Sequence, residues 1–351
     1  MRDPQNIKPA VRALRAYSLS PHRASVKLNQ NESPWDAPAL IKEEVLRRFS
    51  ARAWSRYPDF IPVSLHERLA RFAGWKPDGI IAGTGSNELI QALLMVTVEP
   101  GKRVLISEPT FALYRQVATV LGGEVESVPQ TSALQYDSIA LLEAVKKRQP
   151  DVTIICSPNN PTGCLLLEED LRALLRAARG LVVIDEAYHE FSRQTAVPVL
   201  HDHDNLIVLR TFSKAMAFAA LRVGYLLAAP DLVREIRKAV LPYNLNAFSQ
   251  IAAEVAVERY ESDLLPIVKE IIAERERLRD GLSLIGGLIP VDSKANFMVV
   301  RSGRDPKQIF SDLLAQDILI RDVSSYPMLS DYFRVSVGTP DENDRLLKAL
   351  R

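Results

Sequence analysis

The sequence contains, at residues 206–227, the stretch Leu206-Ile-Val-Leu-Arg-Thr-Phe-Ser-Lys-Ala-Met-Ala-Phe-Ala-Ala-Leu-Arg-Val-Gly-Tyr-Leu-Leu227. The apolar runs at its two ends predict strands, and the connection between them carries one lysine, Lys214. Small and apolar neighbours leave this lysine few ways to be solvated, which lowers the pKa of an amine and frees its lone pair for Schiff-base chemistry. Ser213 and Arg222 suit a phosphate, because arginine offers a planar fork of donors. A reactive lysine beside phosphate ligands indicates pyridoxal phosphate (PLP). The alternative from this stretch alone is a surface lysine in a connecting loop.

Predicted strands and helices alternate along residues 80–227, and one of the helices is predicted to run from Thr110 to Leu121. The apolar runs of the strands are continuous, which is typical of a mostly parallel sheet that helices cover on both faces. Ligands bind such a sheet beyond the carboxyl ends of its strands. Asn160, Asp185 and Lys214 each closely follow a predicted strand. We therefore predict an α/β fold, with a large mixed sheet that is mostly parallel and with these side chains at one of its edges.

The pattern changes after residue 231, where it is first helical, with a long helical region from Ser249 to about Arg279, and then mixes short strands with helices. We predict an extended N-terminal arm over residues 1–25 and, from this change, a large domain over 26–255 and a smaller α+β domain over 256–351. Residues 26–50 are also candidates to pack with the small domain.

Composition narrows the classes of partner and location. Of the 351 residues 47% are hydrophobic and 25% charged, and the formal net charge is +1, so no nucleic acid or anionic membrane is indicated as a partner. No apolar run approaches the roughly 20 residues of a membrane helix, and we expect no signal peptide. Cys156 and Cys164 are predicted to be reduced thiols, so we expect a cytoplasmic protein. The His-Asp-His-Asp run at 201–204 is predicted to be a polar loop, and no metal site is expected.

A second informative stretch is Ile80-Ile-Ala-Gly-Thr-Gly-Ser-Asn-Glu88, in which an apolar run passes through two glycines into a predicted helix. Glycine lets the backbone approach a ligand closely, and the free N–H groups at the start of a helix favour an anion. Gly85 and Ser86 are therefore candidates to hold a phosphate. A capped turn without any ligand explains the same pattern.

Further short motifs run through nearly the whole chain. They are Leu-Asn-Gln-Asn-Glu-Ser-Pro (28–34), Arg-Tyr-Pro (56–58), Gly-Thr-Gly-Ser-Asn-Glu (83–88), Pro-Thr-Phe-Ala-Leu-Tyr (109–114), Asn-Asn-Pro-Thr-Gly (159–163), Asp-Glu-Ala-Tyr (185–188), Thr-Phe-Ser-Lys-Ala (211–215), Pro-Tyr-Asn-Leu-Asn (242–246) and Phe-Arg-Val-Ser-Val-Gly (333–338). With these motifs in this order, the chain resembles the fold-type I PLP-dependent aminotransferases and, within that group, the histidinol-phosphate aminotransferases. The motifs are more specific for fold and cofactor than for the substrate.

The resemblance implies a role for each residue that would hold PLP. Lys214 would form the Schiff base and move a proton between the substrate's Cα and the cofactor. Asp185 would keep the pyridine nitrogen protonated, which makes the ring an electron sink. Tyr188 would complete the catalytic set by tuning the proton affinity of the Schiff base. The other implied cofactor ligands are Asn160 at the ring oxygen, Phe111 on the ring face, and Gly85, Ser86, Ser213, Arg222 and the partner subunit's Tyr57 at the phosphate.

Two positions depart from the resembled pattern. Phe111 stands where these enzymes often have tyrosine, so stacking on the ring is kept and any hydroxyl contact is lost. Ala220 stands where they usually have glycine, which tightens the turn before Arg222 without removing a ligand.

The resemblance also implies the residues that bind the substrate. Arg334 would hold an α-carboxylate through a bidentate pair. Histidinol phosphate has no carboxylate, and Arg321 and Tyr17 match the positions that hold its phosphate, with Asn31 as a further implied contact. The residues alone leave alternatives open, namely Tyr17 as a packing residue of the arm and Arg321 as part of a solvated turn.

The resemblance implies a transaminase that works as an obligate homodimer with two shared active sites. It would exchange an amino group between histidinol phosphate or imidazole acetol phosphate and glutamate or 2-oxoglutarate, in histidine biosynthesis. The alternatives on the same scaffold are an aromatic or broad-range amino-acid aminotransferase and a PLP-dependent decarboxylase of the threonine-phosphate type. A PLP-binding regulator without catalysis is disfavoured, because no basic helix-turn-helix pattern accompanies the motifs.

Overall fold

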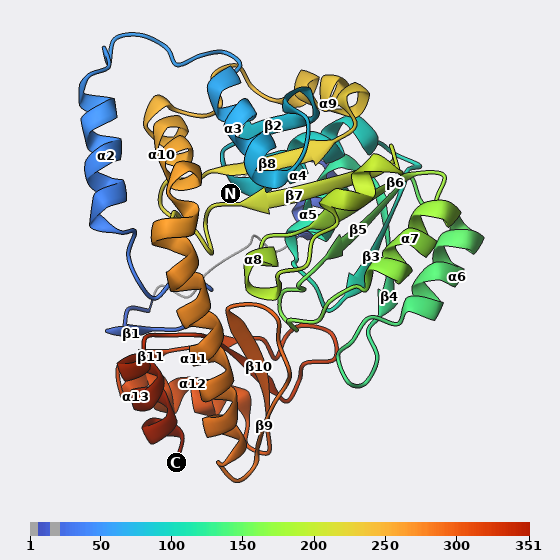
Figure 1. Ribbon diagram of the computed structural model, residues 1–351. Helices are drawn as coiled ribbons and strands as arrows, with labels where there is room; N and C mark the ends of the chain where they lie inside the picture. The colour runs from blue at the N-terminus through green and yellow to red at the C-terminus, as the bar shows by residue number, and fades with distance from the viewer. Residues whose placement is uncertain (1–5, 15–21) are drawn as a thin grey trace.

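The computed structural model describes residues 6–14 and 22–351 and is organised around one seven-stranded sheet (Figure 1). The strand order is β2-β8-β7-β6-β5-β3-β4, in which β8 is antiparallel to both neighbours and the other pairs are parallel. The strands are β2 (Ile80–Gly83), β3 (Arg103–Glu108), β4 (Glu124–Pro129), β5 (Val152–Cys156), β6 (Leu181–Asp185), β7 (Leu206–Thr211) and β8 (Gly224–Ala228). The predicted α/β fold with a mixed, mostly parallel sheet is confirmed.

Helices cover both faces of this sheet, because successive strand residues point into two separate cores. In β7, Leu206 and Val208 belong to one core, and Ile207 and Leu209 belong to the other. Burial on both faces is the reason that these strands are continuously apolar. The helices over the first core are α3 (Val63–Ala73), α6 (Ser138–Arg148), α7 (Glu168–Ala177) and α10 (Ala247–Glu258), and those over the second are α4 (Gly85–Thr97), α5 (Leu113–Leu121) and α9 (Pro230–Ile236).

A second, four-stranded sheet lies towards the C-terminus, with all its neighbouring strands antiparallel in the order β12-β13-β10-β9. Its strands are β9 (Leu288–Pro290), β10 (Phe297–Ser302), β12 (Arg321–Asp322) and β13 (Tyr332–Ser336), and its core is shared with α11 (Leu265–Ser283), α12 (Pro306–Ala315) and α13 (Pro340–Leu350). The early strand β1 (Val26–Lys27) pairs in parallel with β11 (Ile318–Leu319). The domain boundaries predicted at residues 25 and 255 stay predictions.

The two sheets are joined by the helical region after α10, which the sequence predicted as one long segment. It consists of α10, a π-helical turn η4 (Tyr260–Leu264) and α11, which runs down to the smaller sheet in Figure 1. Helix α2 (Ala39–Ser50) packs along α10, and Arg48 forms a 2.7 Å ion pair with Glu258 at its end. The remaining short elements are α8 (His189–Ser192), η1 (Pro77–Gly79), η2 (Val197–His201) and η3 (Arg237–Ala239).

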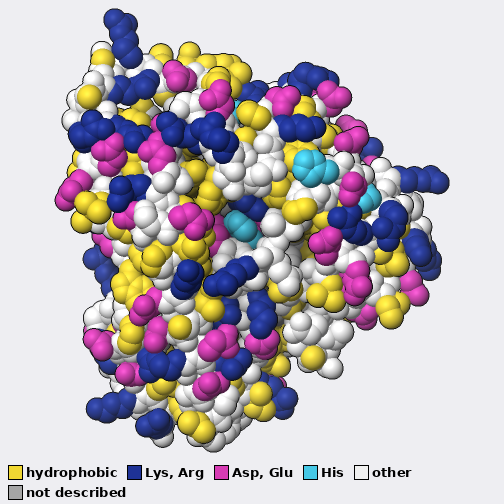
Figure 2. All heavy atoms as spheres, in the orientation of Figure 1, with side chains coloured by type: hydrophobic (Ala, Val, Ile, Leu, Met, Phe, Trp, Pro, Cys, Tyr) yellow, Lys and Arg dark blue, Asp and Glu magenta, His cyan; other side chains and the backbone are white. Residues whose placement is uncertain are grey.

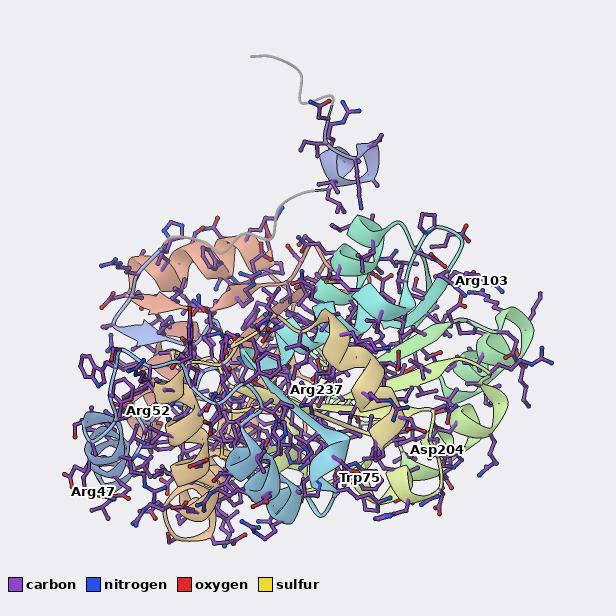
Figure 3. All side chains as sticks on the ribbon, turned by 90° about the horizontal axis from the view of Figure 1, so that it is seen from above. Arg47, Arg52, Trp75, Arg103, Asp204 and Arg237 are labelled. Carbon is purple, nitrogen blue, oxygen red and sulfur yellow. The ribbon has the colours of Figure 1, made fainter. Side chains whose placement is uncertain are left out.

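The N-terminal arm was predicted to be extended, and this prediction is wrong for one segment. Residues Pro9–Ala13 form the short helix α1, which has no buried residue and projects from the body of the molecule beside α5 (Figure 3). Proline at the first helical position explains its start, because its fixed φ suits a helix and its missing N–H costs nothing there. Lys8 Nζ donates to the carbonyl oxygen of Val120 at 3.1 Å, which ties this helix to the end of α5.

A second difference concerns the start of α5, which was predicted at Thr110 and lies at Leu113. Thr110 is buried, and its hydroxyl donates to Asn159 Oδ1 at 2.8 Å rather than facing solvent at a helix start. This delay leaves Phe111 in the irregular segment before the helix, where it borders the pocket described below.

Charged side chains of both signs are interspersed over the face shown in Figure 2, as the net charge of +1 leads one to expect. Within residues 6–14 and 22–351, no helix is both long and apolar enough to cross a membrane.

Candidate active site

The carboxyl ends of β5, β6 and β7 border a pocket of about 480 Å³ that both sheets help to line. Most of the site residues predicted from the sequence meet in it. They are Asn31, Ser86, Phe111, Asn160, Asp185, Tyr188, Ser213, Lys214, Arg222, Arg321 and Arg334. Of the other predicted residues, Gly85 directly precedes the lining residue Ser86, Tyr57 lies outside the pocket, and Tyr17 falls outside the described residues.

Lys214 follows β7, and its amine donates to the backbone oxygen of Gln30 at 3.1 Å. The pKa of Lys214 is lowered to about 8, first by burial and then by the positive charge of Arg334, while Glu32 opposes the shift. A larger fraction of this amine is therefore unprotonated near neutral pH than for a solvated lysine. An unprotonated amine can act as a nucleophile and as a base.

Asp185 is the last residue of β6 and is only 3% exposed. Burial raises its pKa to about 6, against two hydrogen bonds that favour the ionised form. The Tyr114 hydroxyl donates to Oδ2 at 2.7 Å, and the Ala187 N–H donates to Oδ1 at 3.1 Å. With a pKa of about 6, the carboxylate is mostly ionised at neutral pH and can pair with a protonated ring nitrogen.

The opposite end of the pocket is built to receive an anion. Arg222 Nη1 donates to Ser213 Oγ at 2.9 Å, next to the start of α4. A Cβ at Gly85 would lie 2.6 Å from Arg222 Nη2, and one at Gly224 would lie 2.4 Å from the backbone nitrogen of Ser86. Both positions therefore require glycine, which brings the helix start, with its N–H groups and positive dipole end, up to the guanidinium. This combination suits a phosphate.

The smaller sheet contributes two arginines to the pocket. Arg321 of β12 and Arg334 of β13 are direct cross-strand partners, so their side chains lie on the same face of the sheet. Arg334 donates to two neutral acceptors, Asn160 Oδ1 at 2.6 Å and the Asn29 carbonyl oxygen at 2.8 Å. Within the described part of the chain, no carboxylate forms a salt bridge with Arg321. Like charges directly opposite each other are unfavourable, so this pair favours an anionic ligand between them.

Asn31 connects the segment after β1 with the catalytic wall of the pocket. It is 1% exposed, and its Nδ2 donates to the Tyr188 hydroxyl oxygen at 3.1 Å. Ser336 Oγ donates to Asn31 Oδ1 at 3.0 Å and accepts from the Asn31 backbone N–H at 2.9 Å. Burial raises the pKa of Tyr188, so its phenol remains a neutral donor and acceptor. Asn31, predicted as a substrate contact, lines the pocket with its side chain bonded to protein groups.

Tyr57 lies on the outer surface and is 76% exposed. Its ring stacks on Tyr243 with 4.4 Å between centroids, and Phe60 packs edge-on against the same ring. Trp54 and Leu241 are also strongly exposed. The loop that carries Tyr57 therefore belongs to an aromatic surface rather than to the pocket of its own chain.

Comparison with known proteins decides the family. The family model for aminotransferase class I and II matches residues 23–350. The chain belongs to this family. It is 40% identical to a histidinol-phosphate aminotransferase of Chlorobium phaeobacteroides, with 100% of this chain and 98% of the relative covered. It is 38% identical to the same enzyme of Chlorobium luteolum, with 99% of this chain and 97% of the relative covered.

Solved structures share the fold of this aminotransferase. A histidinol-phosphate aminotransferase from Sinorhizobium meliloti, solved in complex with pyridoxal-5'-phosphate, has a TM-score of 0.89 at 26% identity and covers 99% of this chain and 97% of its own. An L-threonine-O-3-phosphate decarboxylase from Porphyromonas gingivalis has a TM-score of 0.81 at 22% identity, covering 93% and 98%. At that identity the second likeness shows the fold alone.

Three residues to which the sequence analysis gave no role hydrogen-bond to predicted residues of the aminotransferase pocket. Tyr114 could have been found, because it lies three residues after Phe111 at the start of a helix. Ser336 could have been found two residues after Arg334 on the same strand face. Gln30 acts through its backbone oxygen, and no side-chain pattern signals such a contact.

Proposed function

We propose that this aminotransferase uses PLP to transfer the amino group of histidinol phosphate to 2-oxoglutarate, giving imidazole acetol phosphate and glutamate. The observation that supports it most is the arrangement of one partly buried lysine, one buried aspartate and one arginine around the anion site, with two further arginines on the opposite wall. The relatives at 36–40% identity, which bear the name histidinol-phosphate aminotransferase, support the same substrate.

The residues present fit PLP by their chemistry. The anion site at Ser213, Arg222 and the start of α4 matches its phosphate, and the basic carboxylate of Asp185 matches its pyridine nitrogen. Gly85 and Gly224 leave the room there that a side chain would fill. When bound, PLP supplies an aldehyde and a pyridine ring that withdraws electrons from the substrate's Cα.

Each residue of the chain then has a physical task. The amine of Lys214 would bind the cofactor's aldehyde carbon with loss of water and, once the substrate's amine has displaced it, would be free to take up the proton that leaves Cα. Asp185 holds a proton at the ring nitrogen, since a buried carboxylate gains most from a positive partner. Phe111 lines the pocket as a flat apolar face, and Asn160 and Tyr188 line it as hydrogen-bonding groups for the ring oxygen.

The substrate side is assigned to the cross-strand arginine pair. Arg334 would bind the α-carboxylate of glutamate, and Arg321 would bind the phosphate of histidinol phosphate, both as bidentate donors. Their shared face keeps the two anion positions at a fixed spacing. Tyr17 and Asn31 remain the further predicted contacts.

We further propose a homodimer in which Tyr57 of each chain reaches the cofactor phosphate of the other. The exposed aromatic surface around Tyr57 supports this assembly, because exposed apolar patches mark interaction sites. A cytoplasmic location is proposed from Cys156 and Cys164, which are both free and buried.

An absorbance titration of the purified protein tests the function. Added PLP should give a visible cofactor band, and glutamate and histidinol phosphate should each bleach it in separate samples, with 2-oxoglutarate restoring it. Bleaching by glutamate and phenylalanine without bleaching by histidinol phosphate would contradict the proposed substrate and favour the broad-range aminotransferase. Release of carbon dioxide from a phosphorylated amino acid would favour the decarboxylase. Absence of any cofactor band would contradict the proposal as a whole.

A further inference from the structure

Tyr114 lies behind the pocket at a position that the proposed reaction leaves without a task. It is fully buried in the first turn of α5, and its hydroxyl is 2.7 Å from Asp185 Oδ2. Its ring packs edge-on against Phe111, with 5.6 Å between centroids and an interplanar angle of 85°. The aromatic contact fixes the ring, so the hydroxyl is held towards the carboxylate.

The other groups around Asp185 do not compete for this role. Ala187 donates to Oδ1 from the backbone, and Glu186 faces away to an ion pair with Arg210 at 2.9 Å. Besides Glu186, whose negative charge helps to raise the pKa of Asp185, four ionisable groups lie close by, and burial raises the pKa of each so that it is neutral at physiological pH. They are Tyr114 from α5, Tyr136 before α6, Cys156 from β5 and Tyr188 after β6. Among the described residues, Tyr114 provides the one side-chain hydrogen bond to this carboxylate.

We propose that Tyr114 is a positioning residue of the transamination, whose hydroxyl orients the Asp185 carboxylate and withdraws negative charge from it. The proposal rests on the proposed function. A carboxylate that already accepts a strong hydrogen bond is a weaker base, so a proton shared with the ring nitrogen stays on the nitrogen. Without the hydroxyl, the carboxylate takes this proton, the ring loses its positive charge, and removal of the Cα proton by Lys214 slows.

The test is Tyr114→Phe, which removes the hydroxyl and keeps the ring. The first measurement is the pKa of Asp185 in the protein without cofactor, followed by NMR of ¹³C-carboxyl aspartate and assigned with Asp185→Asn. A hydrogen bond to a charged group corresponds to a factor of about 10 to 100, so the proton affinity of Asp185 should rise by that factor. The second measurement is the ¹⁵N shift of labelled PLP in the holoenzyme, which should move towards the unprotonated ring. The kcat should fall by about the same factor, with little change in KM.

The matched control is Tyr136→Phe. Tyr136 is a buried tyrosine near the same strands, but its hydroxyl donates to the Cys156 carbonyl oxygen rather than to a carboxylate. Removal of the Tyr136 hydroxyl should lower stability to a similar extent as Tyr114→Phe. It should leave the proton affinity of Asp185 and the ¹⁵N shift of PLP unchanged. Equal shifts in both variants would overturn the proposal, since they would show a general effect of a lost buried hydroxyl.

A folded Tyr114→Phe protein with unchanged Asp185 proton affinity would also overturn the proposal. If this variant fails to fold, 3-fluorotyrosine placed at position 114 keeps the contact and makes the hydroxyl a stronger donor. The proton affinity of Asp185 should then fall, and an unchanged value would count against the proposal. If the proton affinity of Asp185 shifts in a protein that takes up no PLP, the result would support the coupling between Tyr114 and Asp185 and would overturn the proposed function instead.

Discussion

The two walls of the pocket are built and charged in different ways. On the wall of the large sheet, Lys214 follows a buried strand and Asp185 ends one, and burial moves the pKa of both towards neutrality. On the wall of the small sheet, Arg321 and Arg334 face each other across an antiparallel pair and bring two positive charges to the pocket. The first wall is therefore suited to moving protons and the second to binding anions. In this pocket, the large sheet therefore carries the groups for proton transfer, and the small sheet carries the groups that recognise the substrate.

The largest expected effect comes from removing the proton carrier of the first wall. Lys214→Ala should lower the transamination rate by about 10³-fold or more, because one positioned base commonly contributes a factor of 10² to 10⁴ and the nucleophile is lost as well. Single-turnover kinetics with glutamate measure this. The control is Lys238→Ala, which removes an exposed lysine of η3. A Lys214→Ala protein with the native rate would contradict the division between the walls.

A smaller effect concerns stability without cofactor. The pKa of Lys214 falls from its ordinary 10.5 to about 8 on folding, so between these values the unfolded chain binds more protons and stability rises with pH. Below pH 8 the charged Lys214 lowers the free energy of unfolding by its full amount, roughly 3 kcal/mol. Lys214→Met should therefore be more stable than the native chain at pH 7, and the gap should close towards pH 10.5. Urea unfolding across this range measures it.

The second wall should not show this pH dependence, because a guanidinium keeps its charge throughout the range. Arg321→Gln should shift the unfolding free energy by the same amount at pH 7 and pH 10. The distinction between the two walls would be contradicted if the difference in unfolding free energy from the native chain varied with pH for Arg321→Gln. A difference that stayed constant with pH for Lys214→Met would contradict it as well.

Loss of an arginine from the second wall should weaken the binding of the phosphorylated substrate by about 10- to 100-fold. Arg321→Gln is expected to raise the KM for histidinol phosphate by that factor, since a bidentate charged hydrogen bond is lost. The rate with histidinol, which lacks the phosphate, should stay the same. Steady-state kinetics with both substrates give the comparison. If activity with histidinol phosphate and activity with histidinol fell equally, Arg321 would not be the residue that binds the phosphate.

The smallest effect tests backbone strain on the first wall. Ala217, three residues after Lys214, has φ of +58°, a conformation that costs an L-residue with a Cβ about 1 kcal/mol. Ala217→Gly should therefore raise the free energy of unfolding by about 0.5–1 kcal/mol. Ala219→Gly is the control, because its φ is not positive and glycine should only destabilise there. Thermal unfolding of the two variants should move in opposite directions.

Much of the large sheet and its site could be predicted from the sequence. The strands before Asn160, Asp185 and Lys214 are continuously apolar, and polar residues that follow such strands gather at one edge of a parallel sheet. The start of α5 was less predictable. Thr110 could equally cap a helix in solvent, and its burial against Asn159 depends on a segment 49 residues away in the chain.

The sequence by itself determined the type of sheet, the order of its strands along the chain and the chemical identity of the groups at their ends, because these follow from local periodicity and residue type. Only the tertiary structure decided that Arg321 pairs with Arg334, that Tyr114 donates to Asp185, and that the Gln30 backbone accepts from Lys214. Each of these contacts joins segments distant in sequence, and burial then sets their strength. Proton affinities at the site are therefore a property of the folded chain as well as of residue type, since burial moves the pKa of Asp185 from 3.8 to about 6 and that of Lys214 from 10.5 to about 8.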